Sequence, residues 1–127
     1  MNVENILITG SSGLVGAPLV TKLLNKSNLI VGIDPVINSE CNENYKHISI
    51  PLNSVEDVTN LLEKYNITKI IHTGGISGPM LANENPNIII ENNIFFTMYL
   101  IEAARIYKKV NRFIFCSSIS VYGELAE

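Results

Sequence analysis

The segment from Ile6 to Gly16, with the sequence ILITGSSGLVG, constrains the fold of this chain more than any other. Its apolar start, Ile6 to Ile8, is typical of a strand that is buried on both faces of a sheet. Glycines follow at positions 10, 13 and 16, and from Leu14 onward the pattern becomes helical. The segment therefore predicts a buried strand, a tight turn and a helix that starts close to the strand.

Each glycine of this turn has a physical task. Gly10 permits the tight turn, Gly13 lets the backbone approach a pyrophosphate, and Gly16 lets the helix pack close to the strand. Free N–H groups at the helix start would then face the phosphates, and the helix dipole favours their negative charge. Between a strand and a helix, this spacing predicts a dinucleotide-binding site.

Length and composition restrict the class of protein. The chain has 127 residues, enough for one domain with a core, which we expect over residues 1–127. A net charge of −3 argues against nucleic acid or a membrane surface as a partner. The N-terminus lacks a signal peptide and no apolar run has the length of a membrane span, so cytoplasmic localisation is the default expectation.

The cysteines and histidines do not indicate redox or metal chemistry. Cys41 and Cys116 are interpreted as a loop thiol and a buried strand thiol. His47 and His72 lie near expected strands and have no acidic or cysteine partner at ligand spacing, so no metal site is predicted.

Strands and helices are expected to alternate along the chain, which predicts right-handed crossovers and a parallel sheet. The expected fold is a doubly wound, Rossmann-like α/β sheet of order 3-2-1-4-5 that lacks its last members. The expected strands are Asn5–Thr9, Leu29–Ile33, His47–Leu52, Thr68–His72 and Val110–Cys116. The expected helices are Leu14–Asn25, Val55–Tyr65 and a long one from Asn85-Pro86 to Lys108.

Two of these helices carry further signals. Ser54 can cap the second helix, with Asp57 as an acidic partner three residues on. The first helix is expected to bury an apolar stripe formed by Leu14, Val15, Pro18, Leu19, Leu23 and Leu24.

An acidic residue, Asp34, stands at the end of the second expected strand. A carboxylate there can accept hydrogen bonds from the ribose hydroxyls and repels a 2′-phosphate, which favours NAD over NADP. The alternative is a turn or cap aspartate before Pro35. Ligands of an open parallel sheet sit beyond the carboxyl ends of its strands, which groups the glycine turn and Asp34 with Thr73–Gly75 and Ser117–Ser118.

The last two segments have open interpretations. Gly74 and Gly75 either let the backbone approach the middle of the cofactor or form a plain turn. Ser118 either hydrogen-bonds a substrate oxygen near the nicotinamide or satisfies local backbone groups.

Four segments come in the order and spacing of one protein family. They are Thr9–Gly16, Ile71–Gly75, Asn93–Thr97 and Ser117–Gly123. With them, the chain resembles the extended short-chain dehydrogenase/reductases, the NAD-dependent epimerase/dehydratase group that works largely on nucleotide sugars. The resemblance covers nearly all of the chain and implies that NAD is the cofactor.

The resemblance also implies roles for the matching positions. Ser118 matches the catalytic serine or threonine that polarises a substrate oxygen, and Tyr122 matches a substrate-side aromatic residue. The matching cofactor-binding positions are Gly10, Ser12, Gly13, Leu14, Val15, Gly16, Asp34, Thr73, Gly74, Gly75 and Asn93.

The chain departs from the family pattern in three places. Pro51-Leu52 stands where the family usually has an acid that touches adenine, so the contact would be apolar plus backbone. Phe96 replaces a glycine of the long helix. The family's acid/base pair, a tyrosine with a lysine four residues later, is absent after the Ser117–Ser118 turn. One formal match, Tyr65 with Lys69, precedes the fourth strand and would lie at the opposite end of the sheet.

We therefore expect the N-terminal, NAD-binding portion of a nucleotide-sugar epimerase/dehydratase-type oxidoreductase, without turnover as this short chain. The alternatives are a dinucleotide-binding module without catalysis and a self-associating fragment that binds no cofactor. The long helix is apolar on more than one side, and the family commonly uses it in a dimer interface, which predicts a homodimer or larger assembly. Phe113, Ile114 and Phe115 are expected to leave apolar surface and an unpaired sheet edge.

Overall fold

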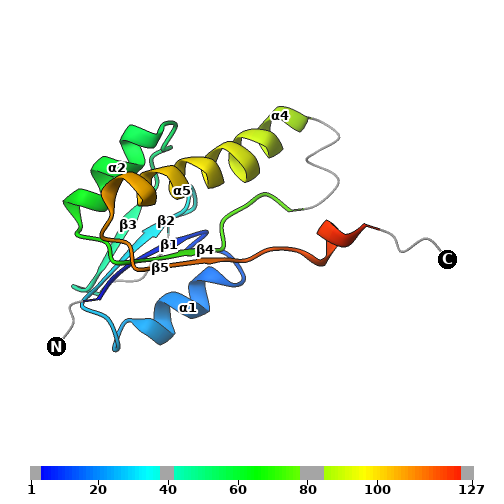
Figure 1. The fold of residues 1–127 in the computed structure, drawn as a ribbon. Helices are drawn as coiled ribbons and strands as arrows, with labels where there is room; N and C mark the ends of the chain where they lie inside the picture. The colour runs from blue at the N-terminus through cyan, green and yellow to red at the C-terminus, as the bar shows by residue number, and fades with distance from the viewer. Residues whose placement is uncertain (1–3, 38–41, 78–84, 124–127) are drawn as a thin grey trace.

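A parallel sheet of five strands, in the order β3-β2-β1-β4-β5, forms the centre of the molecule (Figure 1). The computed structural model describes residues 4–37, 42–77 and 85–123. All neighbouring strands pair in parallel, which confirms the predicted fold class and strand order. The strands are β1 (Asn5–Thr9), β2 (Leu29–Ile33), β3 (Tyr45–Ile48), β4 (Lys69–His72) and β5 (Arg112–Phe115).

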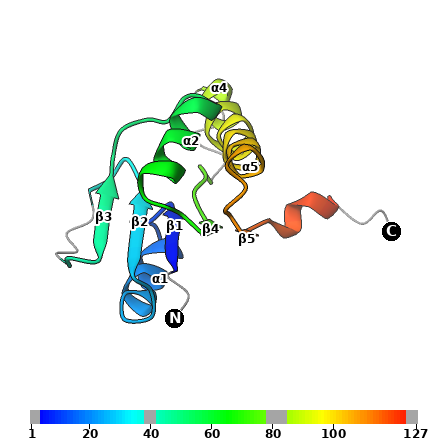
Figure 2. The same cartoon turned by 60° about the vertical axis from the view of Figure 1, so that its left-hand side comes forward.

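Helices cover both faces of the sheet (Figures 1 and 2). Helix α1 (Gly16–Leu23) lies on one face, and α2 (Val55–Lys64) lies on the other beside the long helix. The long helix consists of α4 (Pro86–Ile89), the π-helical segment η1 (Ile90–Phe95) and α5 (Phe96–Tyr107). A short 3-10 helix, η2 (Ile119–Tyr122), follows β5. None of the helices among the described residues is long and apolar enough to cross a membrane.

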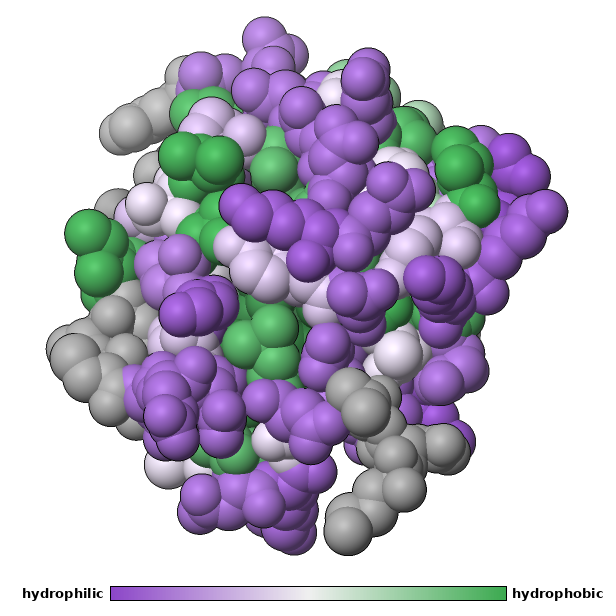
Figure 3. Space-filling model, turned by 90° about the vertical axis from the view of Figure 1, so that its left-hand side faces the viewer, coloured by the Kyte–Doolittle hydropathy of each residue, from purple (hydrophilic) through white to green (hydrophobic). Residues whose placement is uncertain are grey.

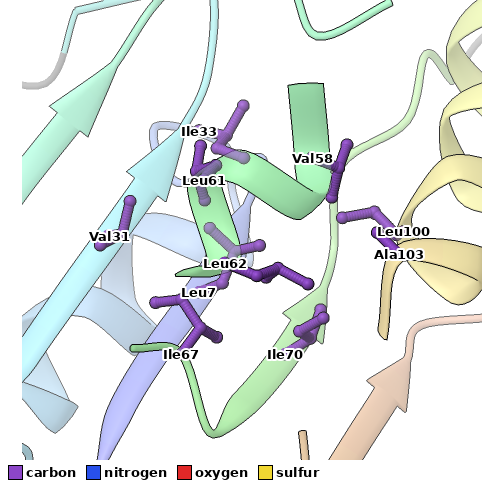
Figure 4. Packing of buried hydrophobic residues seen from close by; sticks show 10 residues of the cluster. All are labelled: Leu7, Val31, Ile33, Val58, Leu61, Leu62, Ile67, Ile70, Leu100 and Ala103. Carbon is purple, nitrogen blue, oxygen red and sulfur yellow. The ribbon is translucent and has the colours of Figure 1, made fainter. Parts of the chain in front are cut away.

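Two apolar layers hold the helices on the sheet. Alternation along β1 supplies both, because Leu7 faces α2 and α5 whereas Ile6 and Ile8 face α1. The layer under α1 also contains Val20, Leu24, Ile30 and Tyr45. Figure 4 shows the larger layer, formed by Leu7, Val31, Ile33, Val58, Leu61, Leu62, Ile67, Ile70, Leu100 and Ala103. The end of the molecule at which the strands begin is mostly hydrophilic (Figure 3).

Strand β3 begins and ends earlier than predicted, at Tyr45–Ile48 in place of His47–Leu52. Its pairing with β2 stops at Ile33 and Ile48 because β2 itself ends before Asp34 and Pro35. Residues 49–53 therefore have no strand partner and turn toward α2. The apolar alternation of Ile48, Ile50 and Leu52 continues beyond Ile48, the last residue that pairs with β2. The predicted strand was therefore too long at its C-terminal end.

The predicted apolar stripe of the first helix was wrong at its start. Leu14, with 95% of its surface exposed, and Val15 precede α1, and Pro18 is exposed as well. The packed positions are Val20 and Leu24, with Leu19 and Leu23 beside them. Leu14 and Val15 lie in the turn that leads from β1 to α1, so they do not face the core.

The start of α2 follows the predicted cap with one difference. The Ser54 hydroxyl accepts a hydrogen bond from the Asp57 N–H at 3.0 Å. The Asp57 carboxylate accepts from the N–H of Asn53 at 3.1 Å, one residue before the expected cap position.

Strand β5 forms the sheet edge, and its side chains Ile114 and Phe115 are exposed as predicted. The prediction was wrong for Phe113, which is partly buried because it packs against the apolar layer under α2 and α5. Cys116 follows β5 and is exposed, so its interpretation as a buried thiol was wrong. Cys41 lies outside the described residues.

Candidate functional site

A cleft of about 1020 Å³ opens at the carboxyl ends of the strands. It lies beside β1 and β4, between which the strand order changes direction, the place where open α/β sheets bind ligands. Its walls come from segments far apart in the sequence. These are the turn after β1, Asp34 and Pro35, residues 49–53, residues 73–77, and the helix residues Glu91, Asn92, Phe95, Phe96 and Tyr99.

The turn after β1 is packed too tightly for side chains at two of its glycines. Gly10 has a φ of 66°, and a Cβ built on it would lie 2.7 Å from the Cα of Gly74. A Cβ on Gly16 would lie 2.0 Å from the carbonyl oxygen of Gly10. Gly13 lines the cleft, and its Cβ would meet only the Gly10 oxygen, at 3.2 Å. The turn thus brings bare backbone to the cleft at Gly13.

Backbone N–H groups at this turn are available to an anion. Helix α1 begins at Gly16, and its N-cap, Val15, makes no side-chain capping bond. Among the described residues, no hydrogen bond uses the N–H of Leu14 or Val15, and both residues line the cleft. Helix starts with free N–H groups attract phosphate, which the helix dipole reinforces.

Asp34 is half-buried and organises the loop that follows β2. One carboxylate oxygen accepts the N–H of Ser12 at 3.1 Å, and the other accepts the N–H of Val36 at 2.9 Å. The Ser12 hydroxyl donates to the carbonyl oxygen of Val36 at 2.7 Å. Through these bonds Asp34 acts as a turn residue. Because each carboxylate oxygen can accept two hydrogen bonds, Asp34 can still accept further hydrogen bonds from a ligand in the cleft.

His47 and Tyr45 hold the backbone of Asp34 in place through hydrogen bonds, a role that no local sequence pattern indicated. The Nε2 of His47 lies 3.0 Å from the carbonyl oxygen of Asp34, which only accepts, so Nε2 carries the hydrogen. Its Nδ1 lies 3.1 Å from the Tyr45 hydroxyl, which also contacts the Ser11 hydroxyl at 3.3 Å. The ends of β2 and β3 are thereby joined beside Asp34.

A second buried histidine, His72, joins the ends of β1 and β4 to the long helix. Its Nδ1 lies 2.6 Å from the Thr9 hydroxyl and its Nε2 lies 2.8 Å from the Thr97 hydroxyl. Only 1% of the residue surface is exposed, and desolvation by burial lowers the pKa of His72 to about 4. The ring is therefore neutral at physiological pH.

The predicted site residues divide into two groups by location. The glycine turn, Leu14, Val15, Asp34 and Thr73–Gly75 line the cleft together. Ser12 touches this wall through its bond to Asp34, whereas Asn93 does not line the cleft and pairs with the backbone of Ile76.

Ser118 and Tyr122 do not reach the cleft. Ser118 caps η2, where its hydroxyl oxygen accepts from the N–H of Ser120 at 3.1 Å, and Tyr122 is 79% exposed. Figure 1 shows η2 extending away from the sheet beyond β5. Their assigned roles in catalysis and substrate binding stay predictions.

The formal pair of Tyr65 and Lys69 lies at the other end of the sheet. Tyr65 ends α2, and its carbonyl oxygen accepts from the side chain of Asn5 at the start of β1. Lys69 begins β4 and pairs with Glu4. Both residues are remote from the cleft.

The family model described as the NAD dependent epimerase/dehydratase family matches residues 6–127. The chain belongs to this family. An uncharacterized protein of Methanocaldococcus jannaschii is 32% identical over 97% of this chain and 42% of its own length. UDP-glucose 4-epimerase of Pisum sativum is 27% identical over 95% of this chain and 38% of its own length.

Solved structures agree with this family assignment. UDP-glucuronic acid 4-epimerase of Bacillus cereus, in complex with UDP-glucuronic acid and NAD, has a TM-score of 0.79 and 29% identity over 97% of this chain and 43% of its own. Uronate dehydrogenase of Agrobacterium tumefaciens, complexed with NAD, has a TM-score of 0.73 and 25% identity over 91% of this chain and 41% of its own. The chain thus spans about two fifths of the length of these relatives.

Two segments that the sequence predicted to depart from the family pattern line the cleft. Pro51 and Leu52 line it together with the exposed Ile50, so this wall is apolar. Phe96 lines it as well and packs edge-on against His72, with the ring centroids 5.9 Å apart. Among the described lining residues only Asp34 and Glu91 are charged, so phosphate would be held by backbone N–H groups and the α1 dipole.

Proposed function

We propose that this chain is the NAD-binding part of a nucleotide-sugar epimerase/dehydratase-type oxidoreductase, with residues 1–127 forming one domain. The observation that carries the proposal is the cleft, where a close-packed glycine turn, free N–H groups and Asp34 meet at the switch in strand order. The Bacillus cereus and Agrobacterium tumefaciens relatives are complexes with NAD, which supports the same cofactor here. The names of the relatives support a nucleotide sugar as substrate.

The residues of the cleft fit the parts of NAD in order. The N–H groups of Leu14 and Val15 would hold the pyrophosphate, and Asp34 would accept from the ribose hydroxyls. The adenine would then lie over the apolar wall at residues 50–52, and Thr73–Gly75 would face the nicotinamide ribose. When bound, NAD supplies the hydride acceptor, and these residues bind and orient it.

We propose that the 127-residue chain does not turn over a substrate. Among the described lining residues, Tyr99 is the only tyrosine and no lysine is present, so the cleft lacks a tyrosine–lysine acid/base pair. Ser118 would stabilise a substrate oxygen and Tyr122 would contact the sugar if η2 lay over the cleft. Epimerases and dehydratases return the hydride to the sugar, so the sugar rather than NADH must be followed. Incubating the chain with NAD and a UDP-sugar should leave the sugar unchanged by ¹H NMR; continuous conversion of the sugar would contradict this part.

Asp34 should decide between NAD and NADP. The chain is expected to bind NAD at least about tenfold more tightly than NADP, because the carboxylate accepts from the ribose and repels a 2′-phosphate. Asp34→Asn should weaken NAD binding by about tenfold and leave NADP binding equal or stronger. Isothermal titration calorimetry measures both. Glu56→Gln removes the same charge outside the cleft and is the control; equal affinities for both cofactors would refute the ribose role.

The long helix carries exposed apolar side chains that we assign to self-association. Ile94, Met98 and Ile101 follow one another along the long helix and are 54%, 55% and 54% exposed. An apolar stripe of this kind on a helix marks an interface, and we assign it to a second copy of the chain. Multi-angle light scattering at micromolar concentration should show a dimer, and Met98→Glu should convert it to a monomer. Thr21→Glu, on α1, should leave the dimer intact; a monomeric unmodified chain would refute the assignment.

A further inference from the structure

The segment 73–77 lines the cleft without regular secondary structure, yet its backbone has fixed partners. The N–H of Gly74 donates to the Thr9 hydroxyl at 3.0 Å, and the Thr73 hydroxyl donates to the carbonyl oxygen of Thr9 at 2.7 Å. Further along, Ile76 is held at both its N–H and its carbonyl oxygen. The course of this loop is therefore determined by residues outside it.

Asn93 provides both bonds to Ile76. Its Oδ1 accepts the N–H of Ile76 at 2.7 Å, and its Nδ2 donates to the carbonyl oxygen of Ile76 at 2.8 Å. The amide thus pairs with the loop as a neighbouring strand would. A Cβ built on Gly75 would lie 3.2 Å from the same Oδ1, so the amide also packs against Gly75. The carboxamide of Asn93 is directed at the loop, and the residue does not line the cleft.

His72 connects this pair to β1. The Thr97 hydroxyl donates to the carbonyl oxygen of Asn93 at 2.8 Å, so it must accept from the Nε2–H of His72. Nδ1 is then an acceptor for the Thr9 hydroxyl, whose oxygen receives the N–H of Gly74. One arrangement of protons satisfies the whole series from Gly74 to the helix, and buried, fully satisfied networks of this kind are rigid.

The rings around His72 and the local helix geometry support the same arrangement. Phe115 stacks on the imidazole at 5.4 Å between centroids, and Phe96 packs on it edge-on. Asn93 lies in the π-helical segment η1, and Thr97 lies in the first turn of α5. Such wide turns are rare and occur frequently at functional sites.

We propose that Asn93 and His72 are positioning residues that hold the Thr73–Ser77 backbone as the wall of the cleft against the middle of the dinucleotide, without touching the ligand. The inference rests on the proposed NAD binding. The loop is also coupled to the glycine turn, because Gly74 leaves no room for a Cβ on Gly10. A shift of the loop would therefore move the wall beside the pyrophosphate, whereas Asp34, on β2, would keep its place.

Asn93→Asp tests the inference because it replaces only the side-chain NH2 group of Asn93 by an oxygen. The variant keeps an acceptor for the Ile76 N–H and replaces the Nδ2–H donor by an oxygen that faces the Ile76 carbonyl. The affinity for NAD should fall about tenfold, whereas that for AMP, which lacks the second half of the dinucleotide, should change less than about twofold. In the unliganded protein, the amide resonances of Gly74, Gly75 and Ile76 should shift.

Two further variants complete the test. Asn87→Asp makes the same change at an exposed position of α4 and should leave both affinities unchanged. Thr97→Val removes the acceptor of His72 at constant size and should reproduce the selective loss of NAD affinity, which covers the case that Asn93→Asp fails to fold. Unchanged NAD affinity in both variants, or equal losses for NAD and AMP, would overturn the inference.

Failure of the inference is distinguishable from failure of the proposed function. If the unmodified chain binds no NAD, the proposed function fails. The positioning role is then decided by the amide resonances of the unliganded variants: shifts concentrated in residues 73–77 would support it, and their absence would refute it.

Discussion

Gly16→Ala is expected to lower the free energy of unfolding by about 1–3 kcal/mol, the range found for overpacked positions. The added Cβ would lie 2.0 Å from the oxygen, and 2.7 Å from the carbon, of the Gly10 carbonyl. Both are backbone atoms of the turn, so relief requires that α1 move away from β1. Urea denaturation of the variant and the unmodified chain measures the difference. Equal stability would show that the helix start is not packed on the turn.

Gly13→Ala separates binding from stability in the same turn. Its Cβ would meet only one backbone oxygen, at 3.2 Å, so the cost in unfolding free energy should stay below about 1 kcal/mol. The methyl group would stand in the wall of the cleft, and the affinity for NAD should fall at least about tenfold because the pyrophosphate could no longer approach the backbone. Unchanged affinity would place the phosphates elsewhere.

Lowering the pH from 7 to 5 should cost the chain about 2 kcal/mol of stability through His72 alone. The folded-state pKa of His72 is about 4, against 6.5 for an unperturbed histidine, because burial disfavours the charged ring. Between these values the unfolded chain binds more protons than the folded chain. Stability is therefore lost as the pH falls from about 6.5 to about 4, and the total loss approaches about 3 kcal/mol.

His72→Asn isolates this contribution. Carboxylates also titrate below pH 6, but they are common to both proteins, so they cancel when the pH dependence of the variant is subtracted from that of the unmodified chain. The difference between pH 7 and pH 5 should be about 2 kcal/mol by urea denaturation. Parallel pH profiles would mean that the buried imidazole accepts a proton as readily as a free one.

The parts of the fold that the sequence predicted correctly depend on local patterns. The apolar run at Ile6–Ile8, the glycines after it and the alternation of strand and helix determine a parallel sheet, and crossover handedness restricts its order. The β3 end at Ile48 was missed because it depends on where β2 stops. The exposure of Leu14 and Val15 was missed because the helix starts only at Gly16, so helical spacing does not apply to them.

The supports of the cleft could not be predicted from the sequence, because their partners are distant along the chain. Thr9 and His72 are 63 residues apart, and Ile76 and Asn93 are 17 apart. No periodicity links such residues, and a histidine without ligand partners gave no signal beyond its place near a strand. The exposure of the Ser118 and Tyr122 side chains likewise depends on what packs beside η2, and the types of these two residues do not determine it.

The most direct test of the central claim, that the glycine turn and the start of α1 hold the phosphates of NAD, is an NMR titration of the ¹⁵N-labelled chain with NAD. The amide resonances of Leu14, Val15 and Gly16 should move and saturate together with that of Asp34, while those of Tyr65 and Lys69, at the opposite end of the sheet, stay in place. Binding without movement at residues 14–16, or no binding at millimolar NAD, would contradict the account.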